Sequence, residues 1–363
     1  MIKKLFERFA FKAIDRLFRV PSIERFLLRC GLGVLIVIYG GFPLTVILIR
    51  LFLDGVPEGI LNAQQAIEKV DIWIIGTCLL IIIVALGISI ARFIGDRNYL
   101  KQKKIILIEA RGLRDDDGSP LEKTVSNKFE GQIIPILLDL RNKMDGKVIA
   151  PEHAIKEITA VHRSLIQHKS DTDRRNLTTV YGGLTSVPYT YLTGVLLDDE
   201  GEIVTYDWDR TQEAWRSLDS IDNGKEFQVD GIDDISDTTE VVIALSFSYP
   251  INKQDIRSTF NHPIVRLTLD GMSSDAHWSQ VKQNRLAQQF LEVVKHLSAV
   301  GVERIHLVMA APNSTVFTFG RRYDKRNLPE IIVYQFEKGN NPAYPWGVLM
   351  PVSGVDQAKI VSG

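Results

Sequence analysis

The chain of 363 residues has only two cysteines, Cys30 and Cys78, and both lie in or beside apolar runs. In such positions, small apolar packing residues are expected rather than a disulfide or a metal site. Positive charge is not in excess either, because the formal net charge is −1. Without a global basic field, the composition argues against DNA or RNA polymers as partners.

The sequence also lacks the local motifs of common nucleotide-processing and hydrolytic enzymes. No GxxxxGK[ST] phosphate loop, GxSxG elbow or HExxH motif occurs. The GxG at residues 31–33 opens an apolar run, which excludes a dinucleotide-binding fingerprint. The seven histidines are scattered, and each is expected to lie at the surface or in the core with its hydrogen bonds made. The carboxylates of residues 198–240 are expected to form a solvent-exposed face. These absences predict a protein that is not an enzyme and has no cofactor, catalytic residue or metal site.

Two long uncharged runs dominate residues 30–95 and predict membrane spans at about 30–50 and 72–92. About 20 apolar residues cross a ~30 Å hydrocarbon core as a helix. The link between the runs is acidic on balance, whereas the segments outside them are basic. The positive-inside rule therefore predicts that both termini are cytoplasmic. No row of ionisable residues lies within either run, so a selective ion pathway is not indicated.

The N-terminal segment, residues 1–29, carries eight lysines and arginines against three acidic residues. Within it, residues 2–18 place their apolar side chains on one helical face and their basic side chains on the other. A basic amphipathic helix of this kind is typical of a membrane interface. The alternative is a helix that packs on the cytosolic domain.

Residues 100–363 change to an α/β pattern. Apolar runs predict strands, and apolar residues at helical spacing predict helices over 151–169 and 277–301. Residues 131–146 fit a strand or a helix equally well. The expected strands lie near the start of 103–118 and at 177–183, 202–208, 239–250, 265–271, 304–312 and 330–337.

This region contains an internal repeat. The stretch VYGGLTSVPYTYLTG (180–194) matches VMAAPNSTVFTFG (308–320), and EIVTYDW (202–208) matches EIIVYQF (330–336). Within about ten residues, each copy then reaches a tryptophan, Trp215 or Trp346. The repeat predicts two related α/β units, at about residues 104–235 and 236–363.

Small and polar residues follow several of the predicted strands. In α/β units ligands bind at the carboxyl ends of the strands, where small residues let a ligand approach the backbone. The relevant loops combine Ser, Thr, Asn and Arg with aromatic residues, which is the chemistry that nucleotides require. These loops are residues 110–114, 182–185, 246–249 and 310–314.

The stretch IHLVMAAPNSTVFTFGRRYDKRNLPEIIVYQFE (305–337) resembles the SAVED domain, in which a strand ends in small residues and proline before a Gly-Arg step and a further strand. Residues 180–215 look like the first half of the same domain, and the resemblance covers about 104–352. A SAVED domain consists of two fused CARF-like, Rossmann-like units, which fits the repeat. Two membrane helices before such a domain resemble the transmembrane effectors of bacterial CBASS anti-phage systems.

The resemblance implies a function. A partner nucleotidyltransferase would make a cyclic oligonucleotide, expected to be a cyclic trinucleotide. The SAVED domain would bind it, and the protein would form homo-oligomers that disrupt the bacterial inner membrane in an abortive-infection response. Two alternatives stay open: a membrane-tethered ring nuclease that cleaves such a ligand, and a passive membrane anchor that recruits a partner.

The resemblance also assigns expected ligand contacts. Arg111 and Arg114 would meet phosphates, Trp278 would stack on a base, and Leu184 and Thr185 would close one side of the pocket. The second half would supply the loop that corresponds to the one after the first strand, three residues that face the cyclic oligonucleotide, and two arginines beyond a Phe-Thr-Phe turn. These are Ser246, Ser248 and Tyr249, then Pro312, Asn313 and Ser314, and finally Arg321 and Arg322.

Overall fold

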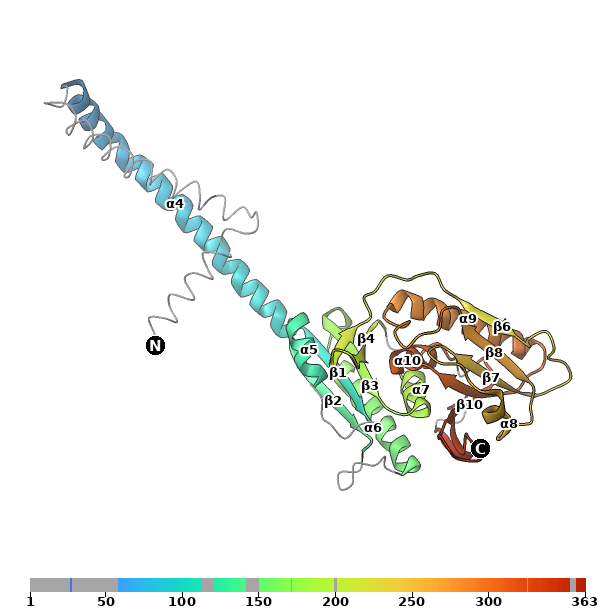
Figure 1. Cartoon of the computed structure of the whole chain (residues 1–363). Coiled ribbons are helices and arrows are strands. Elements are labelled where there is room, and N and C mark those ends of the chain that lie inside the picture. The colour runs from blue at the N-terminus through green and yellow to red at the C-terminus, as the bar shows by residue number, and fades with distance from the viewer. Residues whose placement is uncertain are drawn as a thin grey trace. The chain divides into compact units, whose positions relative to one another are not determined.

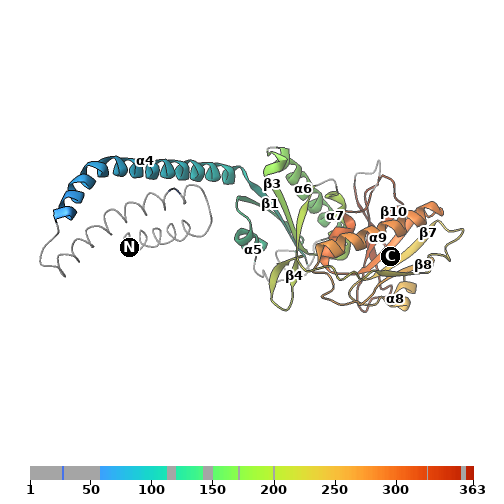
Figure 2. The ribbon, with the colours of Figure 1, turned by 90° about the horizontal axis from the view of Figure 1, so that it is seen from above.

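The computed structural model of the chain describes residue 27 and residues 58–112, 120–141, 150–170, 172–198, 201–324, 326–352 and 357–363. The chain divides into two compact units, Met1–Leu100 and Lys101–Gly363. Figure 1 shows the chain coloured by residue number, and Figure 2 shows it from above.

The N-terminal unit contains a long helix, α4 (Glu58–Gln102). Within the described residues, one helical segment, Gly76–Arg97, is long and apolar enough to cross a membrane. Only 11% of the residues in its most apolar stretch are buried. Its exposed side chains include Leu80, Ile83 and Phe93, as contact with lipid requires. This segment overlaps the span expected at 72–92. The span expected at 30–50 and the amphipathic helix expected at 2–18 lie outside the described residues.

The second unit begins with a five-stranded sheet in the order β2-β1-β3-β4-β5. The first four strands of that order are parallel, and β5 pairs antiparallel with β4. Both ends of β1 are partly exposed and its six inner residues are buried, as is usual for a parallel strand covered on both faces. The elements are β1 (Lys104–Arg111), α5 (Leu121–Lys128), β2 (Gln132–Asp139), α6 (Pro151–Ser170), β3 (Leu177–Leu184), α7 (Val187–Leu196), β4 (Ile203–Asp209) and β5 (Ala214–Ser217).

A seven-stranded sheet follows, in the order β12-β11-β10-β9-β7-β8-β6. Its central strands β10, β9, β7 and β8 are parallel, and β11, β12 and β6 are antiparallel to their neighbours. The elements are β6 (Phe227–Asp230), β7 (Glu240–Ser246), α8 (Lys253–Arg257), β8 (Ile264–Leu269), α9 (Gln280–Ala299), β9 (Arg304–Ala310), α10 (Asn313–Gly320), β10 (Glu330–Gln335), β11 (Trp346–Leu349) and β12 (Lys359–Ser362).

The two sheets repeat one topology. The order β2-β1-β3-β4-β5 of the first sheet corresponds to β8-β7-β9-β10-β11 of the second, with the last strand antiparallel in both. The residues matched in the sequence, Trp215 and Trp346, lie on the equivalent strands β5 and β11. The predicted α/β duplication is therefore confirmed. Because β6 pairs with β8, the second sheet also includes residues 227–230, which precede 236.

Residues 131–146, which the sequence left undecided, contain the strand β2. The Phe-Thr-Phe segment expected as a turn is instead part of helix α10, so that expectation is wrong. Apart from its first residue, every residue of α10 is buried. A helix without an exposed face shows no apolar periodicity, which explains why the sequence pattern did not reveal it.

Helices α7 and α10 pack together where the two halves meet (Figure 1). A Cβ added to Gly194 of α7 would collide with the carbonyl oxygen of Phe317, and one added to Gly320 of α10 would collide with that of Tyr191. These glycines, which end the two repeated stretches, allow the helix backbones to touch. The Tyr181 ring of β3 stacks on the Phe317 ring at 3.7 Å, so one apolar core joins both halves.

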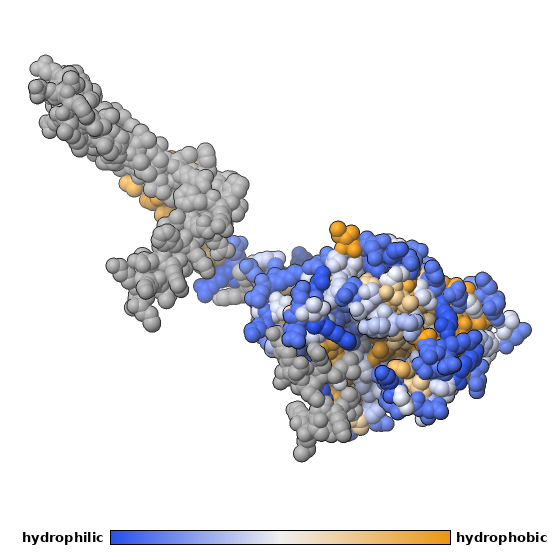
Figure 3. Space-filling model, viewed as in Figure 1, coloured by the Kyte–Doolittle hydropathy of each residue, from blue (hydrophilic) through white to orange (hydrophobic). Residues whose placement is uncertain are grey.

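The outer surface of Lys101–Gly363 is mainly hydrophilic on the face that Figure 3 shows, as expected for a domain in water.

Candidate ligand-binding site

A cavity of about 340 Å³ lies at the carboxyl ends of strands from both halves. The first half contributes Leu184 at the end of β3 and residues around the end of β4. The second half contributes the ends of β7 and β9, the start of α10 and the loop before α9. This is the composite position at which α/β sheets bind ligands. The lining residues are Leu184, Asp207, Trp208, Arg210, Thr211, Ser248, Tyr249, Ser274, Asp275, His277, Trp278, Met309, Ala310, Ala311, Pro312 and Asn313.

Asn313 joins the two halves at the cavity wall. Its Oδ1 accepts hydrogen bonds from the Thr185 backbone N–H at 3.0 Å and from the Thr190 hydroxyl at 2.8 Å. The hydroxyls of Thr185 and Thr190 lie 2.7 Å apart and share a further hydrogen bond. The side-chain oxygen of Asn313 and the threonine pair therefore hold the start of α7 against the start of α10.

Asp207 makes the reciprocal connection from β4. Its Oδ2 accepts from the Ser314 backbone N–H at 2.9 Å, and its Oδ1 accepts from the Trp208 N–H at 2.7 Å. The residue before α10 is Pro312, whose side chain makes no capping hydrogen bond. A buried carboxylate from the other half therefore caps this helix, where the helix dipole favours a negative charge.

His277 is a buried polar side chain of this wall without a hydrogen-bond partner. It is 4% exposed, and neither ring nitrogen makes a hydrogen bond to a described residue. Its Nε2 lies 3.6 Å from Asp207 Oδ2. Burial lowers the pKa of His277, and the nearby Asp207 carboxylate and a weak backbone contact with Ser274 only partly oppose this shift. A neutral imidazole offers one hydrogen-bond donor and one acceptor. Because buried polar atoms are normally hydrogen-bonded, these two nitrogens are candidates for hydrogen bonds to a ligand.

The lowered pKa of His277 predicts a pH effect on stability. The unfolded chain binds a proton at a higher pH than the folded chain, so this histidine makes folding less favourable as the pH falls below about 6.5. His306 acts in the same direction, because burial lowers its pKa too. In thermal denaturation of the full-length chain in detergent, the fall in Tm between pH 7.0 and 5.5 should be smaller for His277→Gln than for the parent. An equal fall would contradict the depressed pKa.

Trp278 is less available for stacking than the sequence predicted. It is 7% exposed, and its ring already contacts the Arg216 guanidinium at 4.5 Å and the His277 ring at 4.1 Å. Tyr249 is the more open aromatic group, since it is 58% exposed and lines the cavity after β7.

Arg210 is the exposed cation that lines the cavity. It follows β4, and its guanidinium makes no hydrogen bond or ion pair with the part of the chain that the structure describes. The contacts expected from the sequence did not include Arg210, Asp207 or His277. The only sequence signal was the place of His277 beside Trp278 and ahead of a long helix.

The structure gathers six of the expected contacts around the cavity, namely Leu184, Ser248, Tyr249, Trp278, Pro312 and Asn313. Thr185 adjoins them through Asn313. Ser314 is only 1% exposed, and its hydroxyl accepts from Gln283 Nε2 at 2.9 Å. The Ser246 hydroxyl accepts from the Ile251 N–H at 3.2 Å and so shapes the loop after β7. Neither serine hydroxyl lines the cavity, and both have structural partners.

The expected arginines lie elsewhere. Arg111 forms an ion pair with Glu109 at 2.6 Å and does not line the cavity, and Arg114 lies outside the described residues. Arg321 and Arg322 line a second hollow of about 320 Å³. The length of α10 separates them from Asn313, and Arg321 donates to the carbonyl oxygens of Leu197 and Gly201 at 3.1 and 2.8 Å. The two arginines therefore lie beyond a helix, α10, and not just beyond a turn as expected.

Comparisons with known proteins identify the domains. The family described as "SMODS-associated and fused to various effectors sensor domain" (SAVED) matches residues 159–350, and the SAVED-fused 2TM effector domain matches residues 3–155. The second match includes β1 and β2, which pair in one sheet with β3 of the SAVED match. No curated protein matches the chain.

Similar solved structures are SAVED/CARF-domain containing receptors called Cap4. The Acinetobacter baumannii receptor with the cyclic trinucleotide 2'3'3'-cAAA is 15% identical, with a TM-score of 0.45 over 75% of this chain and 55% of that chain. The same receptor with 3'3'3'-cAAA is 18% identical, with a TM-score of 0.43 over the same shares. The Moraxella osloensis receptor is 16% identical, with a TM-score of 0.40 over 66% of this chain and 48% of that chain.

This chain spans about half the length of those receptors. The SAVED match covers more than half of the chain, and it includes every residue that lines the cavity. The chain therefore belongs to the SAVED family of sensor domains, here joined to a SAVED-fused 2TM effector domain.

Proposed function

We propose that this protein is a membrane-bound sensor and effector of a CBASS-type defence system, and that it binds a cyclic trinucleotide in the cavity between its two halves. The observation that carries the proposal is the composite cavity of a SAVED-family domain, with the unpartnered His277 ring in its wall and the Arg210 guanidinium at its edge. A partner nucleotidyltransferase in the cytosol would supply the ligand.

Five residues of the cavity wall have a chemical role in this proposal. The Arg210 guanidinium meets a phosphate, since a guanidinium pairs with phosphate oxygens in a bidentate manner. The exposed Tyr249 ring stacks on a base, and the His277 ring nitrogens donate to or accept from a base edge or a ribose hydroxyl. The small side chains of Ala310 and Ala311 leave space for the ligand to approach the backbone of the cavity wall.

The cavity is also placed to transmit binding. Asn313 and Asp207 each hold the other half's helix start, so a ligand that moves either residue changes how the halves meet. A ligand shifts such an equilibrium only through a difference in affinity for two arrangements. About 340 Å³ is near the lower end of small-molecule sites, so part of a cyclic trinucleotide stays outside the cavity. We infer that a second copy covers this part and that ligand-induced homo-oligomers result.

The oligomers would then gather the membrane helices and disrupt the inner membrane, which gives abortive infection. The chain is expected to cross the membrane twice with both termini in the cytoplasm, which places the sensor domain where the ligand is made. The apolar segment Gly76–Arg97 supports one of these crossings.

The function is tested with the full-length chain reconstituted in liposomes that contain a self-quenched dye. Dye release is expected only when a cyclic trinucleotide is added to the side that carries the sensor domain. Liposomes without protein and a linear trinucleotide are the controls. Release that does not depend on ligand, or no release although ligand is bound, would contradict the effector proposal; the second result would favour a passive anchor.

A second candidate function, cleavage of the ligand, is favoured by one observation. His277 and Asp207 lie 3.6 Å apart at the cavity, as a general base and its orienting carboxylate do. Incubation of the full-length chain with the ligand, followed by chromatography, distinguishes the two functions. Linear products that disappear in His277→Gln would identify a ring nuclease, and unchanged cyclic ligand would leave the sensor proposal alone.

A further inference from the structure

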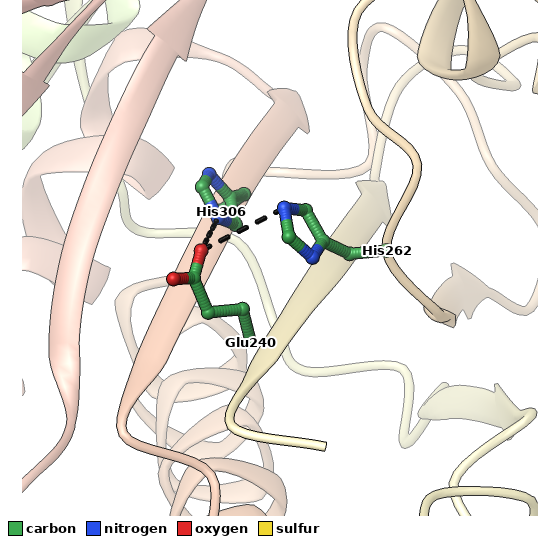
Figure 4. A group of neighbouring side chains, drawn as sticks. All are labelled: Glu240, His262 and His306. Atoms are coloured by element: carbon green, nitrogen blue, oxygen red, sulfur yellow. Dashed lines mark hydrogen bonds and ion pairs between the residues drawn. The ribbon is translucent and has the colours of Figure 1, made fainter.

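A second group of converging side chains lies at the opposite edge of the seven-stranded sheet from the cavity. Glu240 is the first residue of β7, His306 lies near the start of β9, and His262 lies two residues before the start of β8. These three strands are parallel, so their amino ends meet at one edge. Figure 4 shows both imidazole rings directed at the carboxylate of Glu240.

We propose that Glu240, His262 and His306 form a binding site for a divalent transition-metal ion, for which zinc fits best. Their donor atoms all lie within 4.8 Å of one another. Glu240 Oε2 lies 2.9 Å from His306 Nε2 and 3.6 Å from His262 Nε2. Ligands at about 2.0–2.1 Å from a tetrahedral zinc ion are about 3.3 Å apart, a value that these two distances bracket.

The hydrogen-bond partners of His306 allow it to act as a metal ligand. A neutral imidazole carries one proton and leaves its other ring nitrogen able to bind a metal ion. Its Nδ1 lies 3.0 Å from the Tyr334 hydroxyl. Without a metal ion, an Nε2–H donates to Glu240 Oε2 at 2.9 Å. When Nδ1 instead donates to the Tyr334 hydroxyl, the lone pair of Nε2 faces the Glu240 carboxylate, and the two atoms can coordinate one cation between them. Tyr334 would then orient the ligand, as residues behind metal-binding histidines do.

The net charge of the side chains around Glu240 is negative, which favours binding of a cation. Arg304 pairs with Glu240 at 3.2 Å and with Glu330 at 2.8 Å, so one guanidinium faces two carboxylates. With neutral imidazoles, this group carries one uncompensated negative charge. The rings of His262 and His306 are parallel at 4.8 Å, so protonating both would place two positive rings face to face. A single ion at their edges avoids this.

Access and position are consistent with such a site. The His262 side chain is partly exposed, which gives an ion a route from solvent. Arg257 of α8 donates to the His262 carbonyl oxygen at 2.9 Å and fixes the backbone there. An ion held by these residues would join β7, β9 and the segment before β8. Its expected role is to stabilise the second sheet, independently of what binds in the cavity at the other edge.

The test uses the full-length chain in detergent, stripped of metal with EDTA and dialysed, with Zn²⁺ or Co²⁺ as the probe. We expect one equivalent to bind, the Tm to rise, and Co²⁺ to give the visible absorption of a tetrahedral complex. His262→Gln should weaken binding at least tenfold, and Tyr334→Phe by about tenfold. His296→Gln, which changes an exposed histidine on α9, is the matched control and should bind like the parent.

A single cooperative unfolding transition of each variant in EDTA shows that it folds. If the chain binds neither ion, or if His262→Gln leaves affinity and the Co²⁺ spectrum unchanged, the three residues form only a hydrogen-bonded ion pair and the proposal is wrong. Cyclic-trinucleotide binding measured on the same stripped protein should be unchanged, so failure here is distinguishable from failure of the proposed function.

Discussion

Replacing Arg210 by glutamate is expected to weaken binding of a cyclic trinucleotide by about 10- to 150-fold. A hydrogen bond to a charged group contributes about 1.5–3 kcal/mol, and 1.4 kcal/mol corresponds to a factor of ten. Arg210 lines the cavity and is exposed, so its replacement should leave the fold intact. Calorimetric titration of the full-length chain in detergent measures the loss.

The matched control is Arg322→Glu, an exposed arginine that lines the second hollow. Its affinity should stay within about twofold of the parent. If Arg322→Glu abolishes binding and Arg210→Glu has no effect, the phosphate contact lies beyond α10 and the cavity between the halves is not the site.

Replacing Gly320 by valine is expected to destabilise the folded domain by about 3 kcal/mol. The added Cβ would collide with the carbonyl oxygen of Tyr191, which belongs to the backbone of α7 and cannot rotate away. Overpacking of this kind costs about 1–3 kcal/mol and occasionally more. For a domain of this size the Tm should fall by about 6–12 °C, measured by thermal denaturation of the full-length chain in detergent.

Gly201→Val is the control for this experiment, because a Cβ at Gly201 meets no atom within 4 Å. Its effect should stay within about 0.5 kcal/mol, as for other exposed positions. Equal shifts of Tm for the two variants would show that the contact of α7 and α10 at Gly320 does not carry the stability assigned to it.

The duplicated fold could be predicted from the sequence because both copies keep their order of apolar runs. The match of residues 180–194 with 308–320 correctly anticipated the equivalence of β3 with β9 and of Trp215 with Trp346. Six of the thirteen ligand contacts expected from the sequence line the cavity, since ligands meet the carboxyl ends of parallel strands.

The rest depends on contacts between distant segments. Asp207 lies in an acidic stretch that looked solvated, yet it is buried and bonds to the N–H of Ser314, 107 residues away. Gly182 looked like space for a ligand, but that space is filled by Leu121 of α5 and Trp215 of β5. Local composition does not distinguish a glycine that admits a ligand from one that admits a neighbouring side chain.

The most direct test of the central claim is calorimetric titration of the full-length chain in nanodiscs with a panel of cyclic di-, tri- and tetranucleotides. The account predicts saturable binding of a cyclic trinucleotide, weakened when His277 is replaced by glutamine and unchanged by Gly201→Val. If no cyclic oligonucleotide of the panel binds to the parent chain, the proposed sensor function is contradicted.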